Sequence, residues 1–145
     1  MTLKDAAKLS PDDSALSPIL NYRRVWNVVI ELSKIFSEIA ASQNITEFEA
    51  LKRWAVETDY KKWRVDPVGR VRGVGLVTFQ YLRMQVGVDT CMPDKIIKKF
   101  AKIDFGLDID DDFRFIEAFK KLSERLGISQ ILLSWLIWLA ESDNK

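Results

Sequence analysis

One short segment of this chain has the residue types that bind phosphate: a glycine turn flanked by arginines and followed by a helix pattern. Glycine permits positive φ and leaves no side chain between the backbone and a neighbouring group. A helix that begins directly after such a turn presents unpaired N–H groups and the positive end of its dipole, which favour an anion. Arginine adds charge-assisted hydrogen bonds to phosphate oxygens. The residues expected to bind are Arg70, Arg72, Gly73, Val74 and Gly75, and Val74 should also hold the flanking helices together.

Basic residues on both sides of the turn extend this expected phosphate-binding surface. Upstream lie Lys61, Lys62 and Arg64, and Trp63 among them is the tryptophan best placed to be partly exposed and to stack on a base. Downstream, a three/four spacing puts several lysines on one helix face, with one more beside them: Lys95, Lys98, Lys102 and Lys99. The alternative for all of these side chains is a solvated, charged surface.

The charge of the chain is concentrated in the same region. Residues 61–102 carry a net charge of +7, whereas residues 1–60 carry −2 and residues 103–145 carry −4, and the whole chain is at +1. A local basic face can bind a nucleic acid even when the whole protein is nearly neutral.

The residue types that are missing exclude several kinds of chemistry. The chain has no His and a single cysteine, Cys91, which rules out an intrachain disulfide, a four-cysteine iron–sulfur cluster, the usual zinc sites and the Ser/His and Cys/His nucleophile pairs. No metal site is expected, and acid–base chemistry must come from Asp, Glu, Lys or Tyr. No strand precedes the glycine turn and no third glycine follows at the required spacing, which argues against a dinucleotide-binding loop.

Composition and apolar spacing predict an all-α protein, arranged as a compact orthogonal helical domain. The chain is 48% hydrophobic, has only six Gly and four Pro, and shows no sustained strand alternation. Residues 1–16 are expected to be a flexible or short lead-in, and residues 17–145 a single domain with a helix–hairpin–helix at about 66–86. Helix starts are predicted at Ser17-Pro18, Thr46, Asp66-Pro67, Leu76, Pro93, Asp110–Asp112 and Ser129.

Helix ends and buried faces follow from the same pattern. Ends are predicted near Ser42, Val71, Val86, Phe100, Leu126 and Glu141, with Gly87 and Gly127 as stops. The second helix should bury Phe48, Leu51 and Trp54. Tyr81 and all tryptophans except Trp63 are expected in the core.

Residues 71–100 resemble the hairpin and Gly/Pro…Asp motif of the helix–hairpin–helix DNA glycosylase superfamily, the endonuclease III type. The family's hairpin is matched by Val71-Arg72-Gly73-Val74-Gly75 and its turn glycine by Gly87. Its catalytic Asp is matched by Asp94, with Ile97, Lys99 and Phe100 at the expected places after it. The resemblance implies binding of double-stranded DNA that carries a damaged base, and it allows a monovalent cation at the hairpin carbonyls.

The chain departs from the family at three points. Val77 occupies the position of the family's Schiff-base lysine and cannot form an imine, so no lyase activity is expected. The cluster cysteines are absent. The chain is also short, and its second lobe is expected to be reduced.

The role of Asp94 has two compatible interpretations. In the mechanism that the resemblance implies, its carboxylate would activate water or stabilise positive charge on the sugar of a flipped-out nucleotide. Asp94 is equally expected as the N-cap of the helix that follows Pro93. Asp89, the competing carboxylate, is assigned to a loop.

Three functions therefore remain open from the sequence. They are a monofunctional DNA glycosylase of base-excision repair, a non-catalytic helix–hairpin–helix DNA-binding module, and a helical protein-interaction domain. The sequence lacks a signal-peptide core and any apolar run of membrane-spanning length, which predicts a cytoplasmic protein with no membrane partner. It leaves the oligomeric state open.

Overall fold

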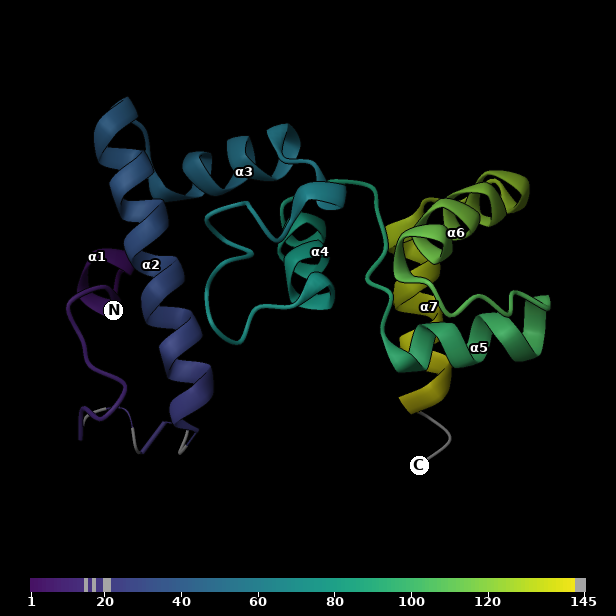
Figure 1. Ribbon diagram of the computed structural model, residues 1–145, viewed down its shortest axis with the longest axis horizontal. Coiled ribbons are helices and arrows are strands. Elements are labelled where there is room, and N and C mark those ends of the chain that lie inside the picture. The colour runs from purple at the N-terminus through teal and green to yellow at the C-terminus, as the bar shows by residue number, and fades with distance from the viewer. Residues whose placement is uncertain (15, 17, 20–21, 143–145) are drawn as a thin grey trace. The chain divides into compact units, whose positions relative to one another are not determined.

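The structure is a computed structural model that describes residues 1–14, 16, 18–19 and 22–142. Over these residues the protein is all-α, as predicted: they form seven α-helices and one 3₁₀ helix, and no strand (Figure 1). The chain divides into two compact units, Met1–Gly75 and Leu76–Lys145, and each is described by itself. None of the helices in the described part of the chain is both long and apolar enough to cross a bilayer.

The first unit is built around one long helix. Helix α2 (Arg23–Gln43) packs against α1 (Leu3–Ala6) and α3 (Glu47–Glu57), and the 3₁₀ helix η1 (Tyr60–Lys62) follows α3. The rings of Phe36 and Trp54 meet edge to face, with centroids 5.6 Å apart, and both side chains are buried. An edge-to-face pair of this kind adds about 0.5–1.5 kcal/mol to the burial of the two rings. This contact fixes α3 against α2.

The first long helix begins later than the sequence predicts. Ser17 lies outside the described residues, but Pro18 and Ile19 are in a turn, and the helix begins at Arg23 after Tyr22, which makes no side-chain cap hydrogen bond. Leu16 is buried, at 2% exposure, and its N–H donates to the Asp13 carbonyl. The segment before the helix is therefore held to the protein by the buried side chain of Leu16.

Helix α3 starts as predicted. The Thr46 hydroxyl accepts from the Glu49 N–H (3.2 Å), and the Glu49 carboxylate accepts from the Thr46 N–H (2.9 Å), which is the expected capping box. The hydrogen bonds from Thr46 lower the pKa of the Glu49 carboxyl. The buried face is only partly as predicted, because Trp54 is buried but Phe48 is 64% exposed.

The predicted short helix from Asp66 to Val71 does not form; residues 66–73 are a series of turns. Asp66 does not act as the expected N-cap. Its carboxylate instead accepts from the Trp54 indole N–H (3.0 and 3.1 Å), the Thr58 hydroxyl (2.6 Å) and the Val68 N–H (2.9 Å). The side chain thus ties the turns to α3. A Cβ at Gly69 would lie 1.7 Å from the Trp63 carbonyl oxygen, so only glycine lets the turns fold this closely on themselves.

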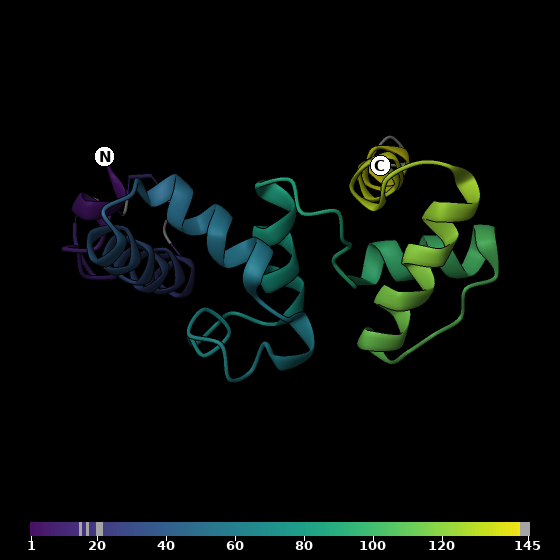
Figure 2. The same ribbon diagram turned by 90° about the horizontal axis from the view of Figure 1, so that it is seen from above.

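The second unit contains four helices. They are α4 (Leu76–Gln85), α5 (Lys95–Phe105), α6 (Asp112–Leu126) and α7 (Gln130–Ser142), and α7 packs against both α5 and α6. In Figure 2, α7 is seen end-on while α5 and α6 run across the view, so α7 crosses the other two helices. Phe79, Phe115, Phe119 and Ile137 are fully buried in this unit.

Local signals placed most helix ends in the second unit correctly. Asp111 is the N-cap of α6, Gly127 ends that helix with φ of 67°, and the Ser129 hydroxyl accepts from the Leu132 N–H at the start of α7. Helix α5 extends past the predicted end at Phe100 to Phe105 and stops at Gly106 in the left-handed conformation. The predicted helix start near Pro93 is confirmed, with Asp94 as the N-cap.

Candidate functional site

A pocket in the second unit brings the predicted catalytic carboxylate together with aromatic side chains. It has a volume of about 390 Å³ and lies between α4, the segment before α5, and α7. Its lining residues are Val77, Thr78, Tyr81, Met92, Asp94, Trp135 and Trp138.

Two hydrogen bonds hold the Asp94 carboxylate at the edge of this pocket. Oδ1 accepts from the Ile97 N–H (2.7 Å), which is the N-cap bond, and Oδ2 accepts from the Trp138 indole N–H (3.2 Å). A carboxylate oxygen can accept two hydrogen bonds, so each oxygen keeps capacity for another donor. The cap interpretation is confirmed, and it leaves Asp94 free to face a ligand.

The loop before Asp94 is fixed by buried polar groups. The Gln80 side-chain amide donates to the Thr90 hydroxyl (2.6 Å) and to the Cys91 carbonyl (3.1 Å), and Arg83 donates to the Gln80 amide oxygen (2.8 Å). Asp89 lies in the loop, as predicted, and its carboxylate accepts from the Ile131 N–H (3.1 Å) at the start of α7. Both walls of the pocket, α4 and α7, therefore hold the loop that carries Asp94.

Burial also controls the one thiol beside the site. Cys91 is fully buried, and this burial raises the pKa of its thiol; the nearby Asp94 and Asp89 carboxylates act in the same direction. A raised pKa keeps the sulfur protonated, so Cys91 is a packing residue and not a nucleophile.

The aromatic lining of the pocket corrects three predictions from the sequence. Tyr81, Trp135 and Trp138 were expected in the core but are 38%, 42% and 36% exposed. Helix α7 is apolar almost all round, so its periodicity could not show which side chains the core covers. The hydrogen bond from the Trp138 indole N–H to Asp94 could not be predicted either, because the two residues are far apart in the sequence.

Val77 lines the same pocket as Asp94, and no lysine lines it. In the resemblance to the glycosylase motif, Val77 takes the position of the Schiff-base lysine. The pocket therefore offers a carboxylate and aromatic faces, but no amine that could form an imine.

The glycine turn belongs to the first unit, and its two glycines differ. Gly73 has φ of 102°, and a Cβ there would lie 2.8 Å from Cγ2 of Val28 on α2. Gly75 has no positive φ, and no described atom lies within 4 Å of the place where its Cβ would be. Val74, between them, is buried. Gly73 is required by the fold, whereas the lack of a side chain at Gly75 leaves open space.

Arginines surround a second pocket, which lies between the turn and the start of α2. Its volume is about 430 Å³, and it is lined by Arg23, Arg24, Asn27, Arg72 and Gly73. The sequence pattern predicts Arg72 and Gly73 as binding residues, but not Arg23, Arg24 or Asn27. Nothing in the local pattern connects the head of α2 with a turn so far along the chain.

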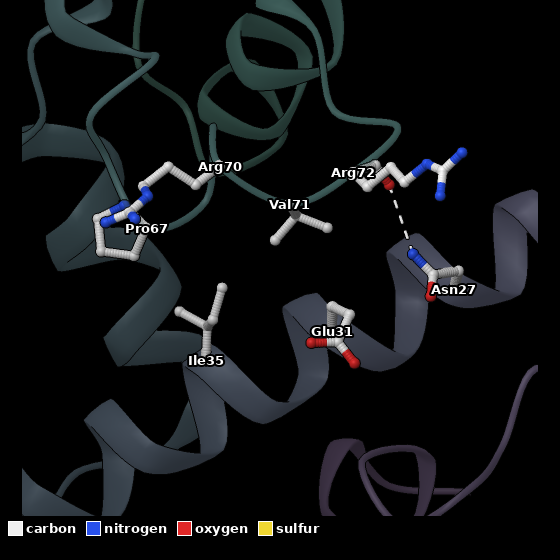
Figure 3. A pocket seen from close by; sticks show the side chains of 7 residues that line it. All are labelled: Asn27, Glu31, Ile35, Pro67, Arg70, Val71 and Arg72. Carbon is white, nitrogen blue, oxygen red and sulfur yellow. Dashed lines mark hydrogen bonds between the residues drawn. The ribbon is translucent and has the colours of Figure 1, made fainter.

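A neighbouring pocket of about 540 Å³ continues along the same helix. Asn27 and Arg72 line both pockets, and Arg70 and Glu31 line only the second (Figure 3). In Figure 3, Val71 points into the space between the turn and α2, while Arg70 and Arg72 extend to opposite sides of it.

The remaining predicted phosphate contacts have different surroundings. Lys98 donates to the Asp112 carboxylate and the Asp110 carbonyl, both at 2.6 Å, and Lys102 pairs with Asp108 at 2.9 Å. Lys95 and Lys99 are exposed, as are Lys61, Lys62 and Arg64, and Trp63 is half-buried with Arg64 over its ring at 5.4 Å. Phosphate binding by Lys98 would have to replace an existing ion pair.

Neither a metal-ligand cluster nor a similarity to known proteins identifies the site further. Across the described residues, no three His, Cys, Asp or Glu side chains gather in a way that could hold a metal ion. No protein-family model, curated protein or solved structure matches the chain.

Proposed function

We propose that this protein binds double-stranded DNA and removes a damaged base by hydrolysis, as a monofunctional glycosylase of base-excision repair. The observation that carries the proposal is the pocket around Asp94. A fixed carboxylate lies beside Tyr81, Trp135 and Trp138, and Val77 lines the same pocket. The sequence motif, and not the pocket, assigns Val77 to the position of the lyase lysine. The finer fold rests on the sequence motif: the glycine turn at Gly73–Gly75 and helix α4 after it are proposed to act as the second half of a helix–hairpin–helix, whereas turns stand in place of its first helix.

The pocket suits a flipped-out base. Exposed indole and phenol rings offer flat apolar faces on which a base can stack, and a stacked base gains about 1–3 kcal/mol. Extrusion from the duplex costs a few kcal/mol, and least when the base is damaged or mispaired. An electron-rich ring also attracts a cation, so alkylated bases that carry a positive charge are the favoured substrates.

The proposed reaction is a water-for-base exchange at the sugar. The bond between C1′ and the base nitrogen breaks, its electron pair leaves with the base, and positive charge develops on the sugar ring. The Asp94 carboxylate faces this charge and accepts a proton from water as the water oxygen bonds to C1′. A cationic alkylated base leaves neutral and needs no further proton, which suits a pocket without a second acid.

The test compares two carboxylates of the same loop. Asp94→Asn keeps an N-cap, because Asn caps helices as well as Asp does, but it loses the negative charge and the acceptor for the Trp138 indole N–H. Asp89→Asn is the matched control, since Asp89 likewise accepts from a helix N-terminal N–H but does not line the pocket. Duplexes with 7-methylguanine, 3-methyladenine or uracil would be assayed for base release in single turnover. Asp94→Asn should lower the rate by about 10²–10⁴-fold, the usual contribution of a general base.

Retention of wild-type base release by Asp94→Asn would refute the assignment of Asp94. Absence of release from every duplex by the wild-type protein would instead favour the non-catalytic DNA-binding module. One observation supports that alternative: both Asp94 oxygens already accept a hydrogen bond, so a purely structural role explains the residue. Anisotropy titration against duplexes with and without an abasic-site analogue separates the two, because only a damage-recognition site should prefer the abasic duplex.

The third function, a protein-interaction domain, has its own motivating feature. Leu132, Leu136 and Leu139 on α7 are 48–60% exposed. A protein-interaction domain should show no affinity for duplex DNA even at low salt, where phosphate contacts are strongest.

A further inference from the structure

We infer that the arginine-lined groove of the first unit, between the head of α2 and the turn at Arg72, is a binding site for phosphate groups. Here "arginine groove" means the pocket lined by Arg23, Arg24, Asn27, Arg72 and Gly73. Its source of phosphate is expected to be a nucleic-acid backbone, and in that respect the inference rests on the proposed function.

The groove is built by contacts between two distant parts of the chain. The Asn27 side-chain amide donates to the Arg72 carbonyl (3.4 Å), which joins α2 to the turn (Figure 3). Gly73 lies so close to α2 that any Cβ would meet Val28 at 2.8 Å. These contacts hold the backbone of Arg72 opposite Arg23 and Arg24, so the three arginines line one pocket.

The positive charge of the groove is poorly compensated within the protein. Arg23 pairs with Asp12 at 3.0 Å, but both side chains are mostly exposed, and such surface pairs contribute little. In the part of the chain that the structure describes, neither Arg24 nor Arg72 is within ion-pair distance of a carboxylate. Glu31 lines only the neighbouring pocket and pairs with Lys34 at 2.7 Å. A bound anion would relieve the repulsion among the arginines.

The chemistry of the groove favours phosphate over other anions. Guanidinium groups match the geometry of phosphate oxygens with paired N–H donors, and several arginines around one anion are typical of phosphate recognition. The first turn of α2 contains no acidic residue, so the positive end of its dipole adds to the same field. Arg70 extends the positive charge along the neighbouring pocket, which suits a ligand with more than one phosphate.

The first experiment measures how many phosphate contacts the groove makes. Arg24→Gln, Arg72→Gln and the double variant would be compared with Lys52→Gln, a loss of one exposed positive charge on α3 of the same unit. Affinity for an undamaged duplex would be measured by anisotropy over a salt series. Each lost phosphate contact should reduce the slope of log affinity against log salt by about 1, so the double variant should lose about 2 and Lys52→Gln none.

The second experiment uses inorganic tripolyphosphate in place of DNA and follows the NMR signals of the wild-type protein. Binding in the groove should shift the Asn27 side-chain amide and the Gly73 N–H, and the double variant should lose these shifts. Shifts without any duplex affinity would establish the groove as a site for free phosphates and would count against the proposed DNA function.

The inference would be overturned if tripolyphosphate moves neither signal and the double variant keeps the wild-type salt slope. In that case a loss of base release in Asp94→Asn would still support the proposed function, so the two failures can be told apart. Circular dichroism of each variant confirms that the helices are intact.

Discussion

Asp66 offers a sharp test of how the first unit holds its arginines in place. The sequence suggests an N-cap for a helix that does not form, whereas the structure shows a carboxylate that accepts from Trp54, Thr58 and Val68. If this is correct, Asp66→Ala removes an acceptor shared by three donors and releases the turns from α3.

The expected loss of stability follows from the number and kind of these bonds. A hydrogen bond to a charged group contributes about 1.5–3 kcal/mol, and the lower end applies to Asp66 because its side chain is only half-buried. Three donors would give more than a single mutation usually costs, but water can reach part of the site and replace one of them. We therefore expect Asp66→Ala to lower the free energy of unfolding by about 2–4 kcal/mol, a large share of the 5–15 kcal/mol typical of a protein.

Urea denaturation followed by tryptophan fluorescence measures this change. The matched control is Asp59→Ala, since Asp59 is exposed and makes one cap bond, to the Lys61 N–H at 2.9 Å. Loss of such a cap costs about 0.5–2 kcal/mol. If Asp66→Ala were no more destabilising than Asp59→Ala, the carboxylate would not be the tie between α3 and the turns.

Two further predictions concern the glycine turn and the buried thiol. Gly73→Ala should lower the free energy of unfolding by about 1–3 kcal/mol, because the φ of 102° at this position is strained for any other residue. Gly75→Ala should leave the thermal midpoint nearly unchanged, because Gly75 has no positive φ and open space around it. Equal effects of the two substitutions on thermal unfolding would contradict this difference. Burial raises the pKa of the Cys91 thiol, so at pH 8 the thiolate is scarce and iodoacetamide should modify Cys91 in urea but not in the folded protein. Mass spectrometry measures the modification, and rapid labelling of the folded protein would show that the thiol is not protected.

Helix boundaries set by neighbouring residues were predictable from the sequence. The Thr46–Glu49 capping box, the N-caps Asp94 and Asp111 and the stop at Gly127 all depend on side chains within one turn of the helix end. Such signals are local, so a single sequence contains them in full.

Local sequence signals gave wrong predictions where groups from distant parts of the chain bind the same side chain. Asp66 precedes a proline and looks like a cap, but Trp54 and Thr58 on the other side of the turn engage its carboxylate instead. The exposure of Phe48 and Trp135 was missed for a related reason, because an apolar residue at helical spacing is buried only if another element covers it.

The sequence named the candidate carboxylate but not its surroundings. Asp94 was proposed from the resemblance of residues 71–100 to a glycosylase motif, and its N-cap role follows from its place before a helix. Its indole partner and its aromatic neighbours come from α7, which no spacing rule connects to α5. Arg23 and Arg24 were missed in the same way, since only the folded first unit brings them to Arg72.

The two interpretations of Asp94 support each other physically. A carboxylate that takes part in a reaction must keep one orientation, and a helix N-cap fixes one of its oxygens without neutralising its charge. In this chain the Ile97 N–H fixes Oδ1 and the Trp138 indole fixes Oδ2, while both oxygens can still accept a proton or a water. Trp138 itself lines the pocket, so a base stacked there would contact the side chain that orients the Asp94 carboxylate. In the proposed reaction, occupancy of the pocket and alignment of Asp94 would be coupled through the Trp138 side chain.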